Sequence, residues 1–377
     1  MNADSVSSHG GYARSVARHS LGWLVAANFV GALLAVLLLW PEANSLLAPF
    51  TYGRWVPLHL DWQLYGWCSL PLTGVLMAAV AGGPEHPATS CSFRLSLRIW
   101  SVTLLLGGFS WLGGTVSGKL FLDWAGWARP LLPLAMAALW FALAGALRDR
   151  WAPLHGGRKA LLVSVLGVLA LVPFVLYYTA GPGTFPAVNP DSGGATGTSL
   201  LGSNLGIVAV GGLLPLLLQL PRKSVSKTRT RLSLLFWPVL AGSAVWFALR
   251  PHGDVSHHEP GEIIGLGLVL AMVPVVIGHL GSFQWPVAAE RWWRAAAAWW
   301  IALVASGWVI FLPGVSESVK FTHVLVAHSH LAMAGLVSSV GGAVLAALGC
   351  APGRASAGFW WWQLGCLAHV LVLLAIG

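Results

Sequence analysis

Residues 21–40, LGWLVAANFVGALLAVLLLW, form an uninterrupted apolar run without a charged residue. A run of about 20 such residues is the length that an α-helix needs to cross a bilayer, where the backbone can satisfy its hydrogen bonds only internally. The run is longer than the core of a signal peptide, and no small-residue cleavage site follows it. We therefore expect it to be a retained transmembrane helix.

The rest of the chain repeats this composition, since 56% of its 377 residues are hydrophobic and 9% are charged. Counting the first run, eleven apolar runs of bilayer length lie at 21–40, 57–80, 99–117, 130–147, 160–180, 199–220, 232–249, 262–281, 295–313, 321–349 and 358–376. We predict an all-α polytopic membrane protein with about 11 transmembrane helices. We expect one membrane domain over 21–377, preceded by a cytoplasmic segment over 1–20, and we find no repeat of fixed period.

The charges indicate the orientation of this predicted bundle. The chain has 21 Lys and Arg residues against 12 Asp and Glu residues, which gives a net charge of +9. If the N-terminus is inside, most of the basic residues fall in inner segments, as the positive-inside rule requires. We therefore predict the inner membrane of a bacterium with a cytoplasmic N-terminus, and no nucleic-acid partner. The acidic residues fall in loops or at predicted helix ends, and the deepest are Asp61 and Glu262.

Residues 321–335, FTHVLVAHSHLAMAG, place His328 and His330 inside an apolar run. Two positions on a helix are about 200° apart, so the two rings leave on nearly opposite faces and cannot share one metal. Neutral imidazole is an axial ligand of haem iron, so each ring can serve a separate site. His59, in the second apolar run, can complete a bis-histidine site. The alternative is that these histidines pack between helices and bond to Ser, Asn or backbone groups.

The stretch 321–335 resembles the haem-ligating tenth helix of subunit I of the haem–copper oxidase superfamily. Residues 56–67, VPLHLDWQLYGW, resemble the second helix of that family, and residues 231–253 resemble its seventh. The C-family (cbb type) and nitric oxide reductase are the most similar branches. This resemblance implies a bundle like that of oxidase subunit I. It also implies that His59 and His330 are the axial pair of a low-spin haem b.

The same resemblance makes His328 the proximal ligand of a second, high-spin haem. Arg54, Arg129 and Arg250 lie in outer segments of the predicted topology, where a guanidinium can pair with haem propionates. The alternative is that these three arginines are ordinary interfacial charges.

The copper site of the family is not matched. The family uses three histidines, one from the sixth helix and an adjacent pair at the end of the seventh. Here Ser203 stands at the first position, and His252 is followed by glycine. A serine hydroxyl is a poor copper ligand, so we expect copper to be absent. His257 and His258 can form a separate metal site with His252, or all three can be solvated loop histidines.

We therefore predict a haem-binding membrane protein with an electron-transfer or structural role in a respiratory complex. The expected partners are the lipid bilayer, other subunits of the complex and a c-type cytochrome on the outer face. The sequence leaves open whether the chain is an enzyme. The alternatives are a working terminal oxidase or nitric oxide reductase with an atypical metal site, a haem-free scaffold or transporter, and a gas sensor that uses His328.

One geometric condition follows from these assignments. If the second helix starts at Pro57, His59 is only one turn deep, whereas His330 is about 13 Å below a helix start at residue 321. The two depths agree better if the second helix begins earlier, within 46–56, or if the tenth helix starts outside the bilayer.

Overall fold

The computed structural model describes residues 11–83, 90–184, 200–250, 259–319, 322–350 and 355–377. Within these ranges the chain is helical and contains no β-strand, apart from one isolated bridge between Arg222 and Phe283. The contacts divide the chain into two compact units, residues 1–187 with 348–350 and residues 188–347 with 351–377. The prediction of a single membrane domain stays a prediction.

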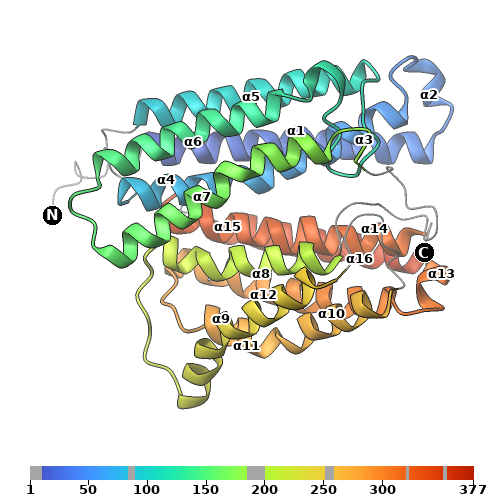
Figure 1. Ribbon diagram of the computed structural model, residues 1–377. Helices are drawn as coiled ribbons and strands as arrows, with labels where there is room; N and C mark the ends of the chain where they lie inside the picture. Colours follow the sequence, from blue (N-terminus) through green and yellow to red (C-terminus); the bar gives the residue numbers. More distant parts are fainter. Residues whose placement is uncertain (1–10, 84–89, 185–199, 251–258, 320–321, 351–354) are drawn as a thin grey trace. The chain divides into compact units, whose positions relative to one another are not determined.

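The first unit holds nine elements, coloured blue to green in Figure 1. They are α1 (Gly11–Leu39), α2 (Ala43–Leu46), α3 (Tyr52–Asp61), the π-helical η2 (Trp62–Cys68), α4 (Ser69–Ala81), α5 (Ser90–Leu112), the 3-10 turn η3 (Gly126–Ala128), α6 (Leu131–Asp149) and α7 (Gly156–Thr179). Helix α1 packs along α3, η2, α4 and α5, while α6 lies between α5 and α7.

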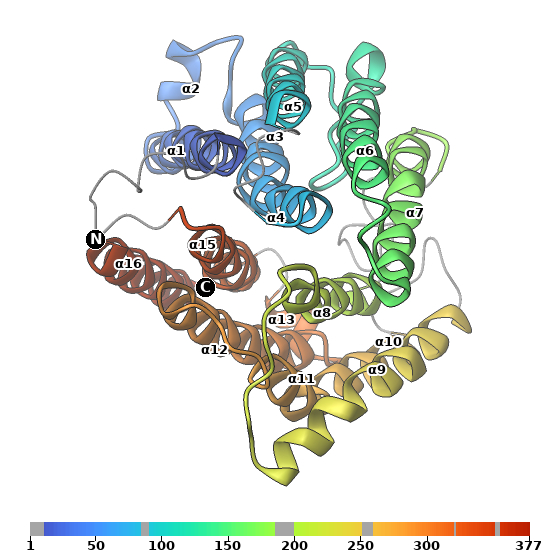
Figure 2. The ribbon, with the colours of Figure 1, turned by 90° about the vertical axis from the view of Figure 1, so that its left-hand side faces the viewer.

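The second unit holds the remaining helices, coloured from lime green to red. They are α8 (Leu200–Leu217), α9 (Lys227–Ala248), α10 (Pro260–Ala271), α11 (Val273–Leu280), α12 (Val287–Ile310), α13 (Val315–Val319), α14 (His323–His330), the π-helical η4 (Leu331–Val337), α15 (Ser338–Ala347) and α16 (Ala355–Ile376). Helix α12 packs on η4 and α15, and α14 packs on α16. Figure 2 shows α12 beside both α15 and α16.

Among the described residues, nine helices are long and apolar enough to cross a membrane. Helices α10 and α11 meet at a 40° bend, and they make a tenth span if the bent pair is counted as one. Pro274 lies in the first turn of α11, where its missing N–H removes a hydrogen bond from a continuous helix. The sixth predicted run, 199–220, forms α8, whose apolar part is shorter than a full span. The multi-pass membrane class is confirmed, but the count of 11 is not.

Small residues let these helices approach closely. A Cβ built on Gly212 would lie 2.3 Å from the Phe236 ring, and one built on Gly265 would lie 2.4 Å from Leu201. Because lipid is as apolar as a side chain, close van der Waals packing of this kind supplies much of the cohesion between membrane helices. Large apolar side chains on the outer surface, such as Phe174 on α7, are exposed and have the character expected against lipid.

Several helices begin earlier than their apolar runs predict, and the earlier starts of the first and second spanning helices overturn expectations from the sequence. Helix α1 begins at Gly11, so residues 11–20, expected to precede the membrane domain, are helical. The second spanning helix begins at Tyr52, whose backbone N–H donates to Asn44 Oδ1 over 2.8 Å, and not at Pro57. Asp61 is consequently the tenth residue of a helix that continues to residue 81, and the expectation that it lies at a helix end is wrong.

Candidate functional site

His59 lies seven residues after the start of α3, and His330 lies seven residues after the start of α14. At 1.5 Å per residue both are about 10 Å along their own helices. Each histidine therefore lies at the same distance from the start of its own helix, because α3 begins before the second apolar run.

The ring of His59 is fixed by α1. Its Nδ1 lies 2.8 Å from the carbonyl oxygen of Ala27. A carbonyl can only accept, so Nδ1 carries the hydrogen of the neutral ring and Nε2 keeps the lone pair. Gly31 makes room for the ring, because a Cβ at that position would lie 2.6 Å from His59 Cε1. Donation of the second ring nitrogen to a carbonyl is typical of histidines that bind metals through the other.

His328 is held in the same tautomer by α12. Its Nδ1 lies 3.1 Å from Ser306 Oγ, and that hydroxyl donates its own hydrogen to the Leu303 carbonyl over 3.2 Å. The serine oxygen therefore acts as the acceptor for His328 Nδ1–H, and Nε2 again keeps the lone pair. Gly307 faces the ring, and a Cβ there would lie 3.1 Å from His328 Cε1.

His330 leaves α14 toward a different helix, as the two-residue spacing requires. Its Nδ1 lies 2.8 Å from the Val326 carbonyl, one turn earlier on the same helix. Its ring contacts His369 of α16 edge to face, with the ring centroids 4.6 Å apart. Two imidazoles on opposite sides of one iron would have their centroids about 6 Å apart, from an M–N bond of about 2 Å. His330 and His369 as they stand are therefore not an axial pair.

His369 was not singled out from the sequence, because nothing in its own stretch marks it. Its neighbours on α16 are ordinary apolar residues, and the partner ring lies 39 positions earlier. Only the packing of α16 on α14 reveals the contact.

His279 is a useful contrast with these three histidines. It is fully buried, stacks on Phe236 with centroids 4.1 Å apart, and bonds through both ring nitrogens. Nε2 lies 3.3 Å from the Gly212 carbonyl, and Nδ1 lies 3.4 Å from Ser233 Oγ. It is a structural histidine that joins three helices.

The three candidate arginines all have protein partners. Arg54 Nη1 donates to the Leu112 carbonyl over 2.7 Å, and Arg129 donates two hydrogens to the Tyr177 carbonyl over 2.9 and 2.6 Å. Arg250 forms a 2.9 Å ion pair with Glu259. Among the described residues, Arg54 and Arg129 bond to neutral carbonyls, whereas Arg250 pairs with the carboxylate of Glu259.

The remaining predicted metal site, His252 with His257 and His258, lies outside the described residues. Within the part of the chain that is described, no group of three or more His, Cys, Asp and Glu side chains is placed to hold a metal ion.

The surroundings of His59 and His328 match in detail, although no repeat is evident in the sequence. In each unit a tryptophan packs on a glycine of the π-helical segment: Trp23 of α1 on Gly66 of η2, and Trp299 of α12 on Gly335 of η4. A Cβ built on either glycine would lie 2.6 Å from the nearest atom of the tryptophan side chain. The indole of each tryptophan donates to a polar side chain of a further helix, which is α5 in the first unit and α16 in the second. The bonds are Trp23 Nε1 to Ser101 Oγ, 3.1 Å, and Trp299 Nε1 to Gln363 Oε1, 2.6 Å.

Two further bonds recur around the π-helical segments. A tryptophan of the third helix donates to the fourth carbonyl of the segment: Trp100 to Tyr65 and Trp362 to Ala334, both over 2.9 Å. A serine directly after the segment donates to the third carbonyl: Ser69 to Leu64 and Ser338 to Met333. We call these three-helix arrangements the histidine modules: α1, α3–η2–α4 and α5 in the first unit, and α12, α14–η4–α15 and α16 in the second.

Within each helix, matched residues of the two modules are separated by the same number of sequence positions. From Trp23 to Trp299 is 276 residues, from His59 to His328 is 269, and from Trp100 to Trp362 is 262. The offset shrinks because the connections between helices are shorter in the second module, which hides the repeat from a search for one period. His59 is therefore the structural counterpart of His328, and Asp61 is the counterpart of His330.

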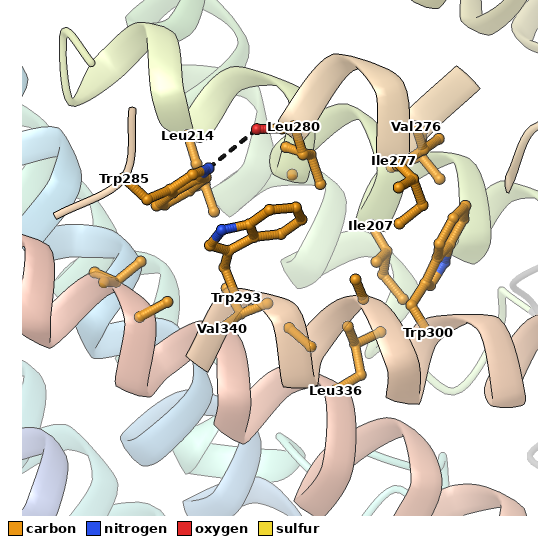
Figure 3. A pocket seen from close by; sticks show the side chains of 16 residues that line it. Ile207, Leu214, Val276, Ile277, Leu280, Trp285, Trp293, Trp300, Leu336 and Val340 are labelled. Atoms are coloured by element: carbon orange, nitrogen blue, oxygen red, sulfur yellow. Dashed lines mark hydrogen bonds between the residues drawn. The ribbon is translucent and has the colours of Figure 1, made fainter. Parts of the chain in front are cut away.

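A small cavity of about 80 Å³ lies in the second unit, lined by α8, α11, α12, η4 and α15. Figure 3 shows Trp293 and Trp300 of α12 beside it, with Trp285 donating its indole hydrogen to the Leu280 carbonyl. The lining is almost entirely apolar, and the volume equals that of a few water molecules. No histidine lines it, so it does not contribute to the histidine site.

Comparison with models of known protein families finds no match for this sequence, and comparison with curated proteins finds no significant relative.

Proposed function

We propose that the chain is a haem-binding integral membrane protein that carries electrons within a respiratory complex. The membrane class follows from the apolar helices themselves. The haem proposal is supported by the chemistry of His59, His328 and His330, and by the sequence resemblance to oxidase subunit I.

The observation that carries the proposal is the shared tautomer of these three rings. Each offers its Nδ1–H to a carbonyl or to a serine oxygen that is itself tied to a carbonyl. Neutral imidazole binds haem iron through the lone pair on Nε2.

In this proposal His59 and His330 are the axial ligands of a low-spin haem b, and His328 is the ligand of a second haem. A bound haem supplies one-electron redox chemistry, and the chain sets ring orientation, burial and the hydrogen bonds behind each ligand. Arg54 and Arg129 are the better candidates for propionate contacts, because Arg250 already pairs with Glu259.

Electron transfer is favoured over oxygen reduction because the residues expected to hold copper are replaced, with Ser203 at the first of the three positions. The proposed location is the inner membrane of a bacterium with the N-terminus in the cytoplasm. A c-type cytochrome on the outer face is the proposed electron donor, alongside other subunits of the complex.

The test is a pyridine haemochrome assay with metal quantification on purified protein. We expect haem b and no copper, with haem content reduced in His59→Ala, His330→Ala and His328→Ala. His323→Ala is the matched control, because His323 is exposed on the same helix as His328 and His330. Purified, folded protein without a Soret band would favour the haem-free scaffold. One copper or non-haem iron per chain with oxygen or NO turnover would favour the oxidase or reductase.

A further inference from the structure

The start of α9 carries a cluster of basic side chains that the proposed haem chemistry does not use. Lys227, Arg229 and Arg231 lie in its first two turns, and all three are exposed. None of them forms an ion pair among the described residues. Lys227 and Arg231 are four positions apart and so lie on one face of the helix, where like charges repel each other. An anion bound at this face would relieve that repulsion.

The cluster lies where two loops of the second unit meet. An isolated antiparallel bridge between Arg222 and Phe283 joins the loop before α9 to the loop before α12, so both helices start at the same end of the unit. A Cβ built on Gly281 would lie 3.8 Å from Cζ of Arg229, which places that side chain beside the second loop. Figure 1 shows the start of α9 projecting at this end of the unit.

The acidic residues of the unit leave this cluster without a counter-charge. Glu290, in the first turn of α12, already pairs with Arg294 over 2.6 Å and lies 4.0 Å from Lys223. The other described carboxylate side chains of the unit follow the opposite ends of α9 and α12, and they are Glu259, Glu262 and Glu317. Among the described side chains, the end of the unit at which α9 begins therefore has an excess of positive charge.

The part of α9 that follows the cluster is apolar and exposed. Leu234 and Leu235, about one turn after Arg231, are 70% and 49% exposed, and the Trp237 indole is exposed as well. One turn rises about 5 Å, which matches the headgroup layer of about 5–8 Å on each side of the hydrocarbon core. A lipid phosphate at the cluster would therefore place its acyl chains against Leu234 and Leu235.

We propose that the start of α9 is a binding surface for an anionic phospholipid. The phosphate accepts hydrogen bonds from Arg229 and Arg231, because a planar guanidinium presents two parallel N–H donors to phosphate oxygens. Lys227 adds a third positive charge. A zwitterionic lipid carries the same phosphate with its own ammonium group, so the surface discriminates by net charge. The acyl chains pack on the exposed face of α9, and binding here does not depend on haem.

The test is native mass spectrometry of the full chain in detergent, titrated with phosphatidylglycerol or with phosphatidylcholine of the same acyl chains. We expect the first lipid to bind with a preference for phosphatidylglycerol that weakens at higher salt, because salt screens exposed charges. Each lost charge should lower the affinity about 5-fold, so Lys227→Gln with Arg229→Gln and Arg231→Gln should lower it about 100-fold. The charge-conserving set Lys227→Arg, Arg229→Lys and Arg231→Lys should keep the preference.

The matched control removes three exposed arginines from the first unit, as Arg14→Gln with Arg18→Gln and Arg98→Gln, and should leave the preference unchanged. Equal losses in the two triple variants would overturn the proposal, because lipid binding would then follow the net charge of the chain and not this surface.

A photoreactive phosphatidylglycerol needs no variant, so it remains decisive if the triple variants do not fold. Cross-links within residues 227–238 support the proposal. Cross-links confined to other helices, or wild-type protein without a preference over phosphatidylcholine, would overturn it. Displacement of the bound lipid by glycerol phosphate alone would assign the surface to a soluble phosphate instead.

Discussion

Substitution of Gly31 and Gly307 by alanine tests whether the rings of His59 and His328 are positioned for a ligand. In Gly31→Ala the new Cβ would lie 2.6 Å from His59 Cε1, so the ring must move by about 1 Å to reach ordinary contact. In Gly307→Ala the distance to His328 Cε1 is 3.1 Å, and a shift of about 0.4 Å suffices. Metal–imidazole bonds are about 2 Å long, so only the larger displacement breaks one.

We therefore expect Gly31→Ala to weaken haem binding at His59 by about 10- to 100-fold, the usual effect of disturbing the support of a metal ligand. Gly307→Ala should keep its haem with a small spectral change. The assay is haem retention per chain after size-exclusion chromatography, measured by pyridine haemochrome.

The matched control is Gly22→Ala, since a Cβ on Gly22, also in α1, meets nothing within 4 Å. It should retain haem and gain about 1 kcal/mol in unfolding free energy from helix propensity. Equal haem loss in the Gly31 and Gly307 variants, or none in either, would refute the positioning argument.

Three further sets of substitutions test the chemistry and packing of the two units. Ser306→Ala removes the acceptor of His328 Nδ1–H and should lower haem affinity about 10-fold in a haem titration, with Ser306→Thr restoring it. Burial raises the pKa of Asp123 to about 6, so wild-type unfolding free energy should fall by about 2 kcal/mol from pH 4 to 7, and Asp123→Asn should lack that slope in denaturant titrations. Trp100→Phe and Trp362→Phe each remove one indole bond and should cost about 1 kcal/mol in thermal melts, and clearly unequal losses would argue against equivalent modules.

The sequence predicted the membrane class and the position of nearly every helix. A backbone in lipid must satisfy its hydrogen bonds internally, so each span is a long apolar helix that hydropathy detects. It placed the helix starts less well. Arg54 and Tyr52 are polar enough to end an apolar run, yet both belong to α3, where Asn44 caps the first turn and Arg54 reaches the Leu112 carbonyl. Such starts depend on partners from other helices, which a hydropathy count does not contain.

The candidate histidines could be found from the sequence, because two imidazoles in an apolar run are costly and therefore informative. Their tautomers could not, since the acceptors Ala27 and Ser306 lie 32 and 22 residues away. His369 was missed for the same reason.

The module repeat was hidden for a different reason. Its shared residues are few and widely spaced, and their offset changes from helix to helix, so neither composition nor a fixed period reveals them. The recurrence is visible only as matched contacts, such as Trp23 on Gly66 and Trp299 on Gly335.

Low-temperature electron paramagnetic resonance of the oxidised, purified chain tests the central claim most directly, because the signal of ferric haem reports its axial ligands. The account predicts a low-spin bis-imidazole signal that disappears in both His59→Ala and His330→Ala and persists in His323→Ala. A folded wild-type chain that shows no ferric haem signal after expression with ample haem, or a bis-imidazole signal unchanged by either substitution, would contradict it.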